Sequence, residues 1–179
     1  VLINCAMSVD GKIAEPSGKQ MKISSEEDLK RMYNLRNKSD AVLVGIGTVL
    51  SDNPKLTVKE KYVKNPKQPI RIVLDTFCRT PINAEVVNET AKTIIVVGYD
   101  CKKKFGENVE IIKAKTTNED FIDLKNLLAV LLKRGIKNLM VEGGSTVISN
   151  FLQEGLVDDF YVYVGPMIIG GENTPTLVN

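Results

Sequence analysis

Four loops carry the residue types that could do chemistry, because each places glycine beside acidic, hydroxyl or other turn-forming residues after an apolar run. Ser8 to Ala14 contains an Asp-Gly pair, whose plainer interpretation is a turn. Val44 to Pro54 contains two glycines together with Thr48 and Asp52. The glycines allow close approach to the backbone, and Thr48 and the following N–H groups could hydrogen-bond a phosphate or a ribose. The plainer alternative is a strand-to-helix turn, since this spacing is not the dinucleotide fingerprint.

The third loop, Val141 to Thr146, carries a stronger signal. Gly143 and Gly144 leave room for a ligand, and two hydroxyl residues, Ser145 and Thr146, stand at the expected start of a helix. Exposed N–H groups and the helix dipole favour a diphosphate at such a position. The alternative is that one hydroxyl only caps its own helix.

Glu142 is an acid at the end of an apolar run, and a carboxylate there is costly unless a ligand or a cation uses it. We therefore expect Glu142 to act on a substrate and not on stability. The fourth loop, Val164 to Gly171, is also glycine-rich but indicates only a loop by itself.

The chain has no histidine, which excludes serine-triad hydrolysis, histidine-ligated metals and imidazole acid–base catalysis. Any catalytic proton must come from Asp, Glu, Lys, Tyr or water. The three cysteines, Cys5, Cys78 and Cys101, lie far apart in the sequence and form no C-x-x-C pair. We therefore expect neither a disulfide framework nor a metal site.

The formal net charge is +2, and lysine and arginine are scattered along the chain, which argues against a nucleic-acid partner. A small positive bias suits an anionic substrate or a phosphate-bearing cofactor. No apolar run reaches the length of a membrane span, and the first residues lack the basic start of a signal peptide. These features predict a soluble cytoplasmic protein.

The elements that position these loops can be predicted from the apolar pattern. Seven runs rich in β-branched residues indicate buried strands: Val1 to Met7, Ala41 to Gly45, Ile70 to Asp75, Thr93 to Gly98, Val109 to Ile112, Asn138 to Val141 and Phe160 to Val164. Helices are expected from a capping box at Ser24 to Glu27 as far as about Lys38, along an apolar stripe that ends at Gly135, and from Ser145 to Glu154.

Strand and helix alternate along nearly the whole chain, which predicts an α/β fold with a largely parallel central sheet covered by helices on both faces. We expect one domain over residues 1–179, with an exposed loop at Lys59 to Pro69. In open sheets of this class ligands bind beyond the carboxyl ends of the strands, where the four loops are expected.

Taken together, these segments resemble the reductase domain of the riboflavin biosynthesis family. The family pattern S-[LV]-D-G-[KR]-I-A is met by Ser8 to Ala14, and V-G-x-G-T-V-L-x-D-[DN]-P-[KR]-L-T-V by Val44 to Val58. P-x-R-[IV]-V-L-D is met by Pro69 to Asp75, V-E-G-G-[ST]-T by Val141 to Thr146, and G-L-V-D by Gly155 to Asp158. The resemblance implies a dihydrofolate-reductase-like fold and the use of NADPH, with NADH as the other candidate.

The resemblance also implies which residues contact the cofactor. They are Ala6, Thr48, Asp52, Asp75, Thr76, Gly143, Gly144, Ser145 and Thr146. Ala6 is expected at the nicotinamide end, and Asp75 and Thr76 along the adenosine half.

The implied substrate is a phosphorylated ribosylamino-pyrimidine. Asn4 and Glu142 are expected to face its ribose or pyrimidine, and Lys55 and Lys59 are the candidates for its phosphate, although Lys59 stands where an arginine is expected. The ribosylamine can open to an imine at C1′ that accepts hydride from C4 of the nicotinamide, so the protein mainly aligns two ligands. Asp52 and Glu142 are the candidate catalytic acids, and either could supply the proton.

No zinc-deaminase motif precedes Val1, and Asn4 stands where bacterial members often have lysine. The chain therefore resembles the stand-alone homodimeric reductases of archaea and fungi, which implies the diamino form of the substrate. Family members continue beyond Asn179, so we expect closing strands to be missing. The alternatives are a dihydrofolate reductase, for which the chain lacks the usual tryptophan, and a nucleotide-binding regulatory module.

Overall fold

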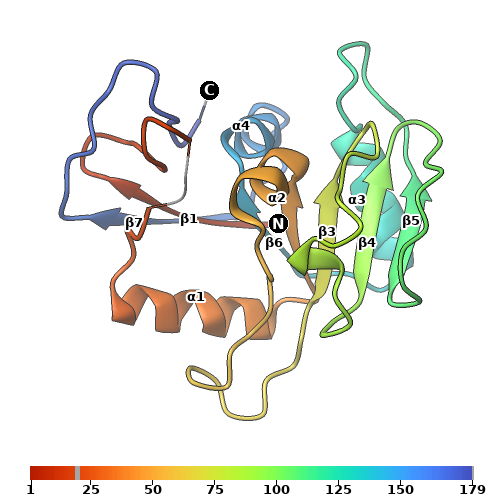
Figure 1. Ribbon diagram of the computed structural model, residues 1–179, viewed down its shortest axis with the longest axis horizontal. Coiled ribbons are helices and arrows are strands. Elements are labelled where there is room, and N and C mark those ends of the chain that lie inside the picture. Colours follow the sequence, from red (N-terminus) through yellow and green to blue (C-terminus); the bar gives the residue numbers. More distant parts are fainter. Residues whose placement is uncertain (19–20, 179) are drawn as a thin grey trace.

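The computed structural model describes residues 1–18 and 21–178, in which strands and helices alternate as predicted. Seven strands form one sheet in the order β5-β4-β3-β2-β6-β1-β7, and neighbouring strands run parallel throughout (Figure 1). Their bounds are β1 Leu2–Ser8, β2 Ala41–Gly45, β3 Ile70–Leu74, β4 Thr93–Val97, β5 Val109–Lys113, β6 Leu139–Gly143 and β7 Asp159–Gly165. Each matches an expected strand to within a few residues.

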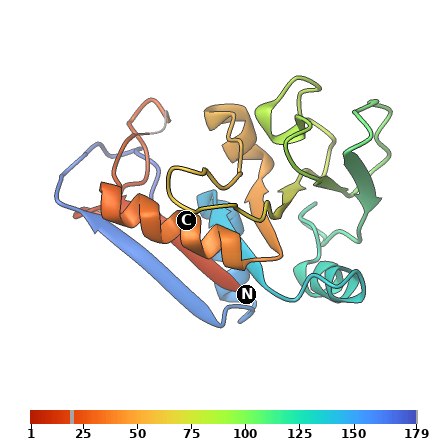
Figure 2. The ribbon, with the colours of Figure 1, turned by 90° about the horizontal axis from the view of Figure 1, so that it is seen from below.

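Helices cover both faces of the sheet, as expected. Their bounds are α1 Glu26–Lys38, α2 Ile46–Asp52, α3 Leu124–Lys133 and α4 Ser145–Gln153, with a short 3-10 helix, η1, at Glu85–Val87. Apolar residues of α3 and α4 belong to one core cluster, and those of α1 and α2 pack in a second cluster on the other face. Figure 2 shows α1 lying alongside β1. None of the described helices is long and apolar enough to cross a membrane.

The helix ends follow the chemistry of their sequences. The Ser25 side chain accepts a hydrogen bond from the backbone N–H of Asp28 and so caps α1. Gly135 and Gly155 follow α3 and α4 with φ of +82° and +65°, a left-handed conformation that few other residues adopt cheaply.

The chain reverses its direction of travel across the sheet between β2 and β6, and this reversal positions the site. From β2 the chain passes through α2 to β3 on one side, whereas from β6 it passes through α4 to β7 on the other. Because β2 and β6 are parallel neighbours, the loops at their carboxyl ends lie together. Such a reversal opens a crevice beyond the strand ends, where open α/β sheets bind ligands.

The expectation that the cysteines form no disulfide is wrong. Cys78 and Cys101 form a disulfide, with their Cα atoms 5.5 Å apart, while Cys5 is free and buried. Cys78 follows β3 and Cys101 follows β4, and these strands are parallel neighbours. The separation of the two cysteines in the sequence therefore does not predict whether they pair, because parallel pairing of the strands brings the loops after both strands to one edge of the sheet.

Candidate active site

Two cavities open at the carboxyl edge of the sheet. Cavity A, of about 530 Å³, lies among the loops that follow β2, β3 and β6 and the segment 119–122. Cavity B, of about 500 Å³, lies among β1, the end of β6 and the segment that leads into α1. The residues that line both cavities are Ile13, Thr48, Asp52 and Gly144. Two ligands bound in A and B would therefore meet beside these four residues.

The N-terminus of α4 faces cavity A and carries no side-chain cap. Gly144 is its N-cap residue and provides no side chain, whereas Ser25 and Asp123 cap α1 and α3. Ser145 and Thr146, at the first two positions of α4, line the cavity. The first N–H groups of a helix and the positive end of its dipole suit an anionic group such as a diphosphate.

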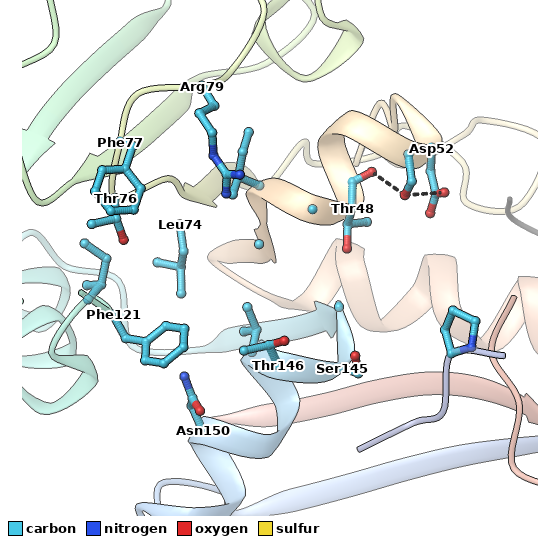
Figure 3. A pocket seen from close by; sticks show the side chains of 18 of the residues that line it. Thr48, Asp52, Leu74, Thr76, Phe77, Arg79, Phe121, Ser145, Thr146 and Asn150 are labelled. Atoms are coloured by element: carbon cyan, nitrogen blue, oxygen red, sulfur yellow. Dashed lines mark hydrogen bonds between the residues drawn. The ribbon is translucent and has the colours of Figure 1, made fainter. Parts of the chain in front are cut away.

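The glycines at the two strand ends keep the crevice open. A Cβ atom on Gly144 would lie 3.2 Å from Oγ1 of Thr48, and one on Gly45 would lie 2.8 Å from the Val147 side chain. Figure 3 shows Thr48 on one side of the cavity, with Ser145 and Thr146 across from it. A larger residue at position 144 would thus occupy the passage between cavities A and B.

Asp52 is the acid that borders both cavities. It is the last residue of α2, is half-buried, and accepts a hydrogen bond from Ser51 Oγ at 2.7 Å. In Figure 3 it lies on the same side of the cavity as Thr48. Asp52 thus borders the region where two ligands would meet.

Glu142 lines cavity B but is not the isolated carboxylate that the sequence indicated. Arg36 of α1 donates from Nε and Nη2 to the two carboxylate oxygens, each at 2.6 Å, and from Nη1 to the backbone oxygen of Thr57 at 2.9 Å. Burial lowers the pKa of the Arg36 guanidinium, but the charge and hydrogen bonds of Glu142, together with Tyr33, outweigh burial and hold this pKa above its ordinary value. Glu142 therefore has a structural role besides any role toward a ligand, and the expectation that it would not affect stability needs correction.

The other residues expected near the nicotinamide and substrate lie on β1. Ala6 lines cavity B. Asn4 precedes Ala6 by two residues and therefore lies on the same face of β1. It is buried, and its Oδ1 atom has no hydrogen-bond partner among the described residues. Ile3 is in register with Val141, so the next residues, Asn4 and Glu142, are neighbours on one face of the sheet. Asn4 is not among the residues that line cavity B.

Asp75 is fully buried and lines neither cavity. Its carboxylate accepts hydrogen bonds from the backbone N–H groups of Arg79 and Thr80 and from Thr80 Oγ1, at 2.7 to 2.8 Å. It thereby fixes the loop after β3, from which Thr76 lines cavity A. The sequence predicted this loop correctly. Asp75 holds the loop through hydrogen bonds to its backbone and to Thr80, and it does not line the cavity.

The two candidate phosphate residues lie outside both cavities. Lys55 is exposed, with its Nζ 3.8 Å from Glu85, and Lys59 places its Nζ 5.7 Å from the centre of the Tyr33 ring. Lys22 lines cavity B among the described residues, although no feature of the sequence singled it out.

Cavity A also contains residues that the sequence reasoning missed: Phe77, Arg79, Phe121 and Asn150. Phe77 and Arg79 follow Asp75 and Thr76 directly, so their position in the loop after β3 is the signal that points to them. Phe121 and Asn150 come from distant segments without a motif, and only the fold brings them to the cavity.

The first and fourth loops join through Asp10. Its carboxylate accepts hydrogen bonds from Ser8 Oγ at 2.6 Å and from the backbone N–H groups of Ile169 and Gly170 at 3.1 and 2.8 Å. The Asp-Gly pair is therefore part of a turn that holds the first and fourth loops together. Ile13, in the same segment, lines both cavities.

Comparison with known proteins gives one consistent result. Residues 1–179 match the RibD C-terminal domain. The 2,5-diamino-6-ribosylamino-4(3H)-pyrimidinone 5′-phosphate reductase of Archaeoglobus fulgidus is 43% identical over 185 residues, which cover 99% of this chain and 84% of that protein. The riboflavin biosynthesis reductase Rib7 of Saccharomyces cerevisiae has a TM-score of 0.81 at 25% identity, over 98% of this chain and 76% of that one.

A bifunctional relative has the same fold. The diaminohydroxyphosphoribosylaminopyrimidine deaminase/5-amino-6-(5-phosphoribosylamino)uracil reductase of Thermotoga maritima has a TM-score of 0.83 at 30% identity. The match covers 98% of this chain but 47% of that protein, so the chain spans about half of its length. The expected α/β fold of the dihydrofolate-reductase-like type is confirmed by this likeness.

Proposed function

The chain belongs to the RibD C-terminal domain family, and from that premise we propose that it reduces a ribosylamino-pyrimidine with NADPH. Membership makes it a reductase of riboflavin biosynthesis, which calls for a reduced nicotinamide cofactor. The substrate that we propose is 2,5-diamino-6-ribosylamino-4(3H)-pyrimidinone 5′-phosphate, whose ribosylamino side chain becomes ribitylamino. The observation that carries the proposal is the junction of cavities A and B at Thr48, Asp52 and Gly144.

The residues of cavity A fit a dinucleotide. The uncapped start of α4 offers donors for the diphosphate, and Gly144 leaves the passage to cavity B free of side-chain atoms. Thr76 lines cavity A and is our candidate for the adenosine half, and Ala6 lines cavity B and is our candidate for the nicotinamide end. When bound, the cofactor supplies the hydride that C1′ of the opened substrate accepts.

Cavity B fits the pyrimidine and its open ribose chain. Glu142 presents a fixed carboxylate that can accept hydrogen bonds from amino or hydroxyl groups, and Asn4 lies beside it with an unpaired amide oxygen. Lys22 is the cation at the cavity wall and joins Lys55 and Lys59 as a candidate for the phosphate.

We assign the proton transfer to Asp52. The Arg36 guanidinium occupies both oxygens of Glu142, which leaves that carboxylate as an acceptor and not as a donor. Asp52 is half-buried at the junction of the cavities, so it can exchange a proton with solvent and pass it to the substrate nitrogen. Alignment of the two ligands by the cavity walls supplies the remaining catalytic effect.

The test compares the diamino pyrimidine with its deaminated counterpart and with dihydrofolate, using the loss of NADPH absorbance. We expect the diamino compound to have the highest kcat/KM, because each mismatched hydrogen bond in a buried site costs about 1–3 kcal/mol. A preference for the deaminated pyrimidine would overturn the substrate while leaving a reductase. Reduction of dihydrofolate alone would overturn the proposal. The homodimeric state implied by the resemblance stays a prediction.

A further inference from the structure

Tyr33 is a buried residue of α1 whose ring is contacted by three other side chains. The Tyr62 ring stacks on it, with the centroids 4.6 Å apart and the two planes 12° from parallel. Cζ of Arg36 lies 5.4 Å and Nζ of Lys59 lies 5.7 Å from the centre of the Tyr33 ring. Both cations are within the distance of about 6 Å at which a ring quadrupole attracts a positive charge. Tyr33 lines neither cavity, so any effect that it has on a ligand passes through these neighbours.

The contact with Arg36 bears on the position of Glu142. Tyr33 and Arg36 are three residues apart on α1 and therefore lie on the same face of the helix. The Arg36 N–H groups that bond Glu142 and the backbone of Thr57 all lie in the plane of the guanidinium. These bonds oppose movement within that plane, and the neighbouring ring limits rotation out of it. Because Arg36 bonds both oxygens of Glu142, a rotated guanidinium would displace the carboxylate that lines cavity B.

The same ring also holds the segment that follows α2. In Figure 1 the chain passes from α2 down past α1 to a long loop before it returns to β3. Lys59 and Tyr62 belong to this loop, and both contact Tyr33. The Gln68 side chain accepts a hydrogen bond from the N–H of Val58 at 2.8 Å and donates one to its backbone oxygen at 2.9 Å, which closes the base of the loop. Tyr33 is therefore the point at which the loop docks on α1, beside the residue that fixes the carboxylate of cavity B.

We infer that Tyr33 is a positioning residue of the proposed substrate site, because its ring holds Arg36, and through Arg36 the Glu142 carboxylate, in the orientation that the site uses. The inference rests on the proposed function, since it takes cavity B as the site of the pyrimidine. The three residues that contact the ring, Arg36, Lys59 and Tyr62, do not line cavity A. Loss of the ring should therefore weaken the interaction with the pyrimidine and leave the binding of NADPH unchanged.

The experiment removes the ring in two ways, by Tyr33→Leu and Tyr33→Met, and retains it in Tyr33→Phe. Methionine adapts its shape to the space that the ring leaves, so it provides a ring-free variant even where the leucine variant does not fold. The matched control is Tyr161→Leu. Arg31 of α1 places its Cζ 5.6 Å from the centre of the Tyr161 ring, so the control removes the same kind of contact with the same helix, and Tyr161 lines neither cavity. Steady-state kinetics with the diamino pyrimidine varied give kcat and KM, titration gives the Kd of NADPH, and thermal melting checks that each variant is folded.

We expect KM for the pyrimidine to rise about five- to tenfold in the ring-free variants, as the loss of one or two cation–π contacts implies, with the Kd of NADPH unchanged within about twofold. Tyr33→Phe should keep most of the affinity for the pyrimidine, and Tyr161→Leu all of it. A folded ring-free variant with unchanged KM would overturn the inference and leave the proposed function intact. So would a parallel loss of NADPH affinity, which would indicate general damage to the fold.

A measurement without substrate separates the inference from the proposed function. The solvent exchange of the Arg36 Nε–H, followed by NMR, reports on its hydrogen bond to Glu142. Exchange should be faster in the ring-free variants than in the unaltered protein and in Tyr161→Leu, and equal exchange would overturn the inference. If the unaltered protein does not reduce the pyrimidine, the proposed function fails, and this exchange still decides whether Tyr33 positions the ion pair.

Discussion

Arg36, in the last turn of α1, and Glu142, at the end of β6, form a largely buried bidentate ion pair across 106 residues of sequence. Their side chains are 12% and 11% exposed. The pair fixes the carboxylate that faces cavity B and, through Thr57, also ties α1 to the segment that follows α2. One contact thus links the stability of the fold to the shape of the proposed substrate site.

Glu142→Gln should therefore weaken both stability and turnover. Removing one partner of a buried ion pair leaves the other charge uncompensated, at a cost of about 3 kcal/mol. Thermal and denaturant unfolding measure this cost, and the control is Glu110→Gln, which breaks the exposed pair with Arg134 and should cost well under about 1 kcal/mol. Unchanged stability in Glu142→Gln would show that the ion pair does not contribute to the fold.

Gly144→Val should abolish cofactor binding in a folded protein. The backbone of Gly144 has φ of −73°, which any residue adopts, so the substitution should be tolerated by the chain. The new side chain would meet Thr48 Oγ1, which lies 3.2 Å from the first added carbon, and would fill the passage between the cavities. Gly144→Ala should weaken binding by less. Ordinary NADPH affinity in folded Gly144→Val, measured by titration, would contradict this use of the passage.

Asp52→Asn should lower kcat by about a hundredfold or more with a much smaller change in KM, because a general acid contributes on this scale. Asp100→Asn is the control, since it removes an exposed carboxylate that lines neither cavity. Steady-state kinetics with both substrates varied separate the two parameters. A loss confined to KM would assign Asp52 to binding and reopen the question of the proton source.

The hydrogen bonds by which Asp10 links the first and fourth loops should persist in acid down to a pH of about 2. Hydrogen bonds from Ser8 and from the N–H groups of Gly170 and Ile169 lower the pKa of Asp10 to about 2, from an ordinary value of 3.8. A lowered pKa means that this contribution to stability is present above the ordinary value and is lost as the pH falls through about 2. The amide chemical shift of Gly170 should follow that titration, and it should not do so in Asp10→Asn. A midpoint near the ordinary value would show that the link is weak.

The strands and the four loops could be predicted because their signals are local. Runs of β-branched residues mark the strands, and parallel pairing places the loops at one edge, so the loops that carry Thr48, Asp52 and Gly144 were expected where cavity A lies. Gly135 likewise marked the end of a helix.

Contacts between distant segments could not be predicted in this way. The partner of Glu142 lies on α1, and no pattern within either segment indicates the other. The sequence marks Asp75 as part of a motif, but only the structure shows that it bonds the loop backbone instead of facing the cavity. The disulfide of Cys78 and Cys101 depends on the pairing of β3 with β4, which spacing alone does not reveal.

The most direct test of the account follows the hydride. The protein is incubated with the diamino pyrimidine and NADPH that carries deuterium at the transferred position of C4, and the product is examined by mass spectrometry and NMR. The proposed function predicts a ribitylamino product with a single deuterium at C1′. Oxidation of NADPH without that label, or no oxidation with this pyrimidine by a protein that binds NADPH, would contradict it.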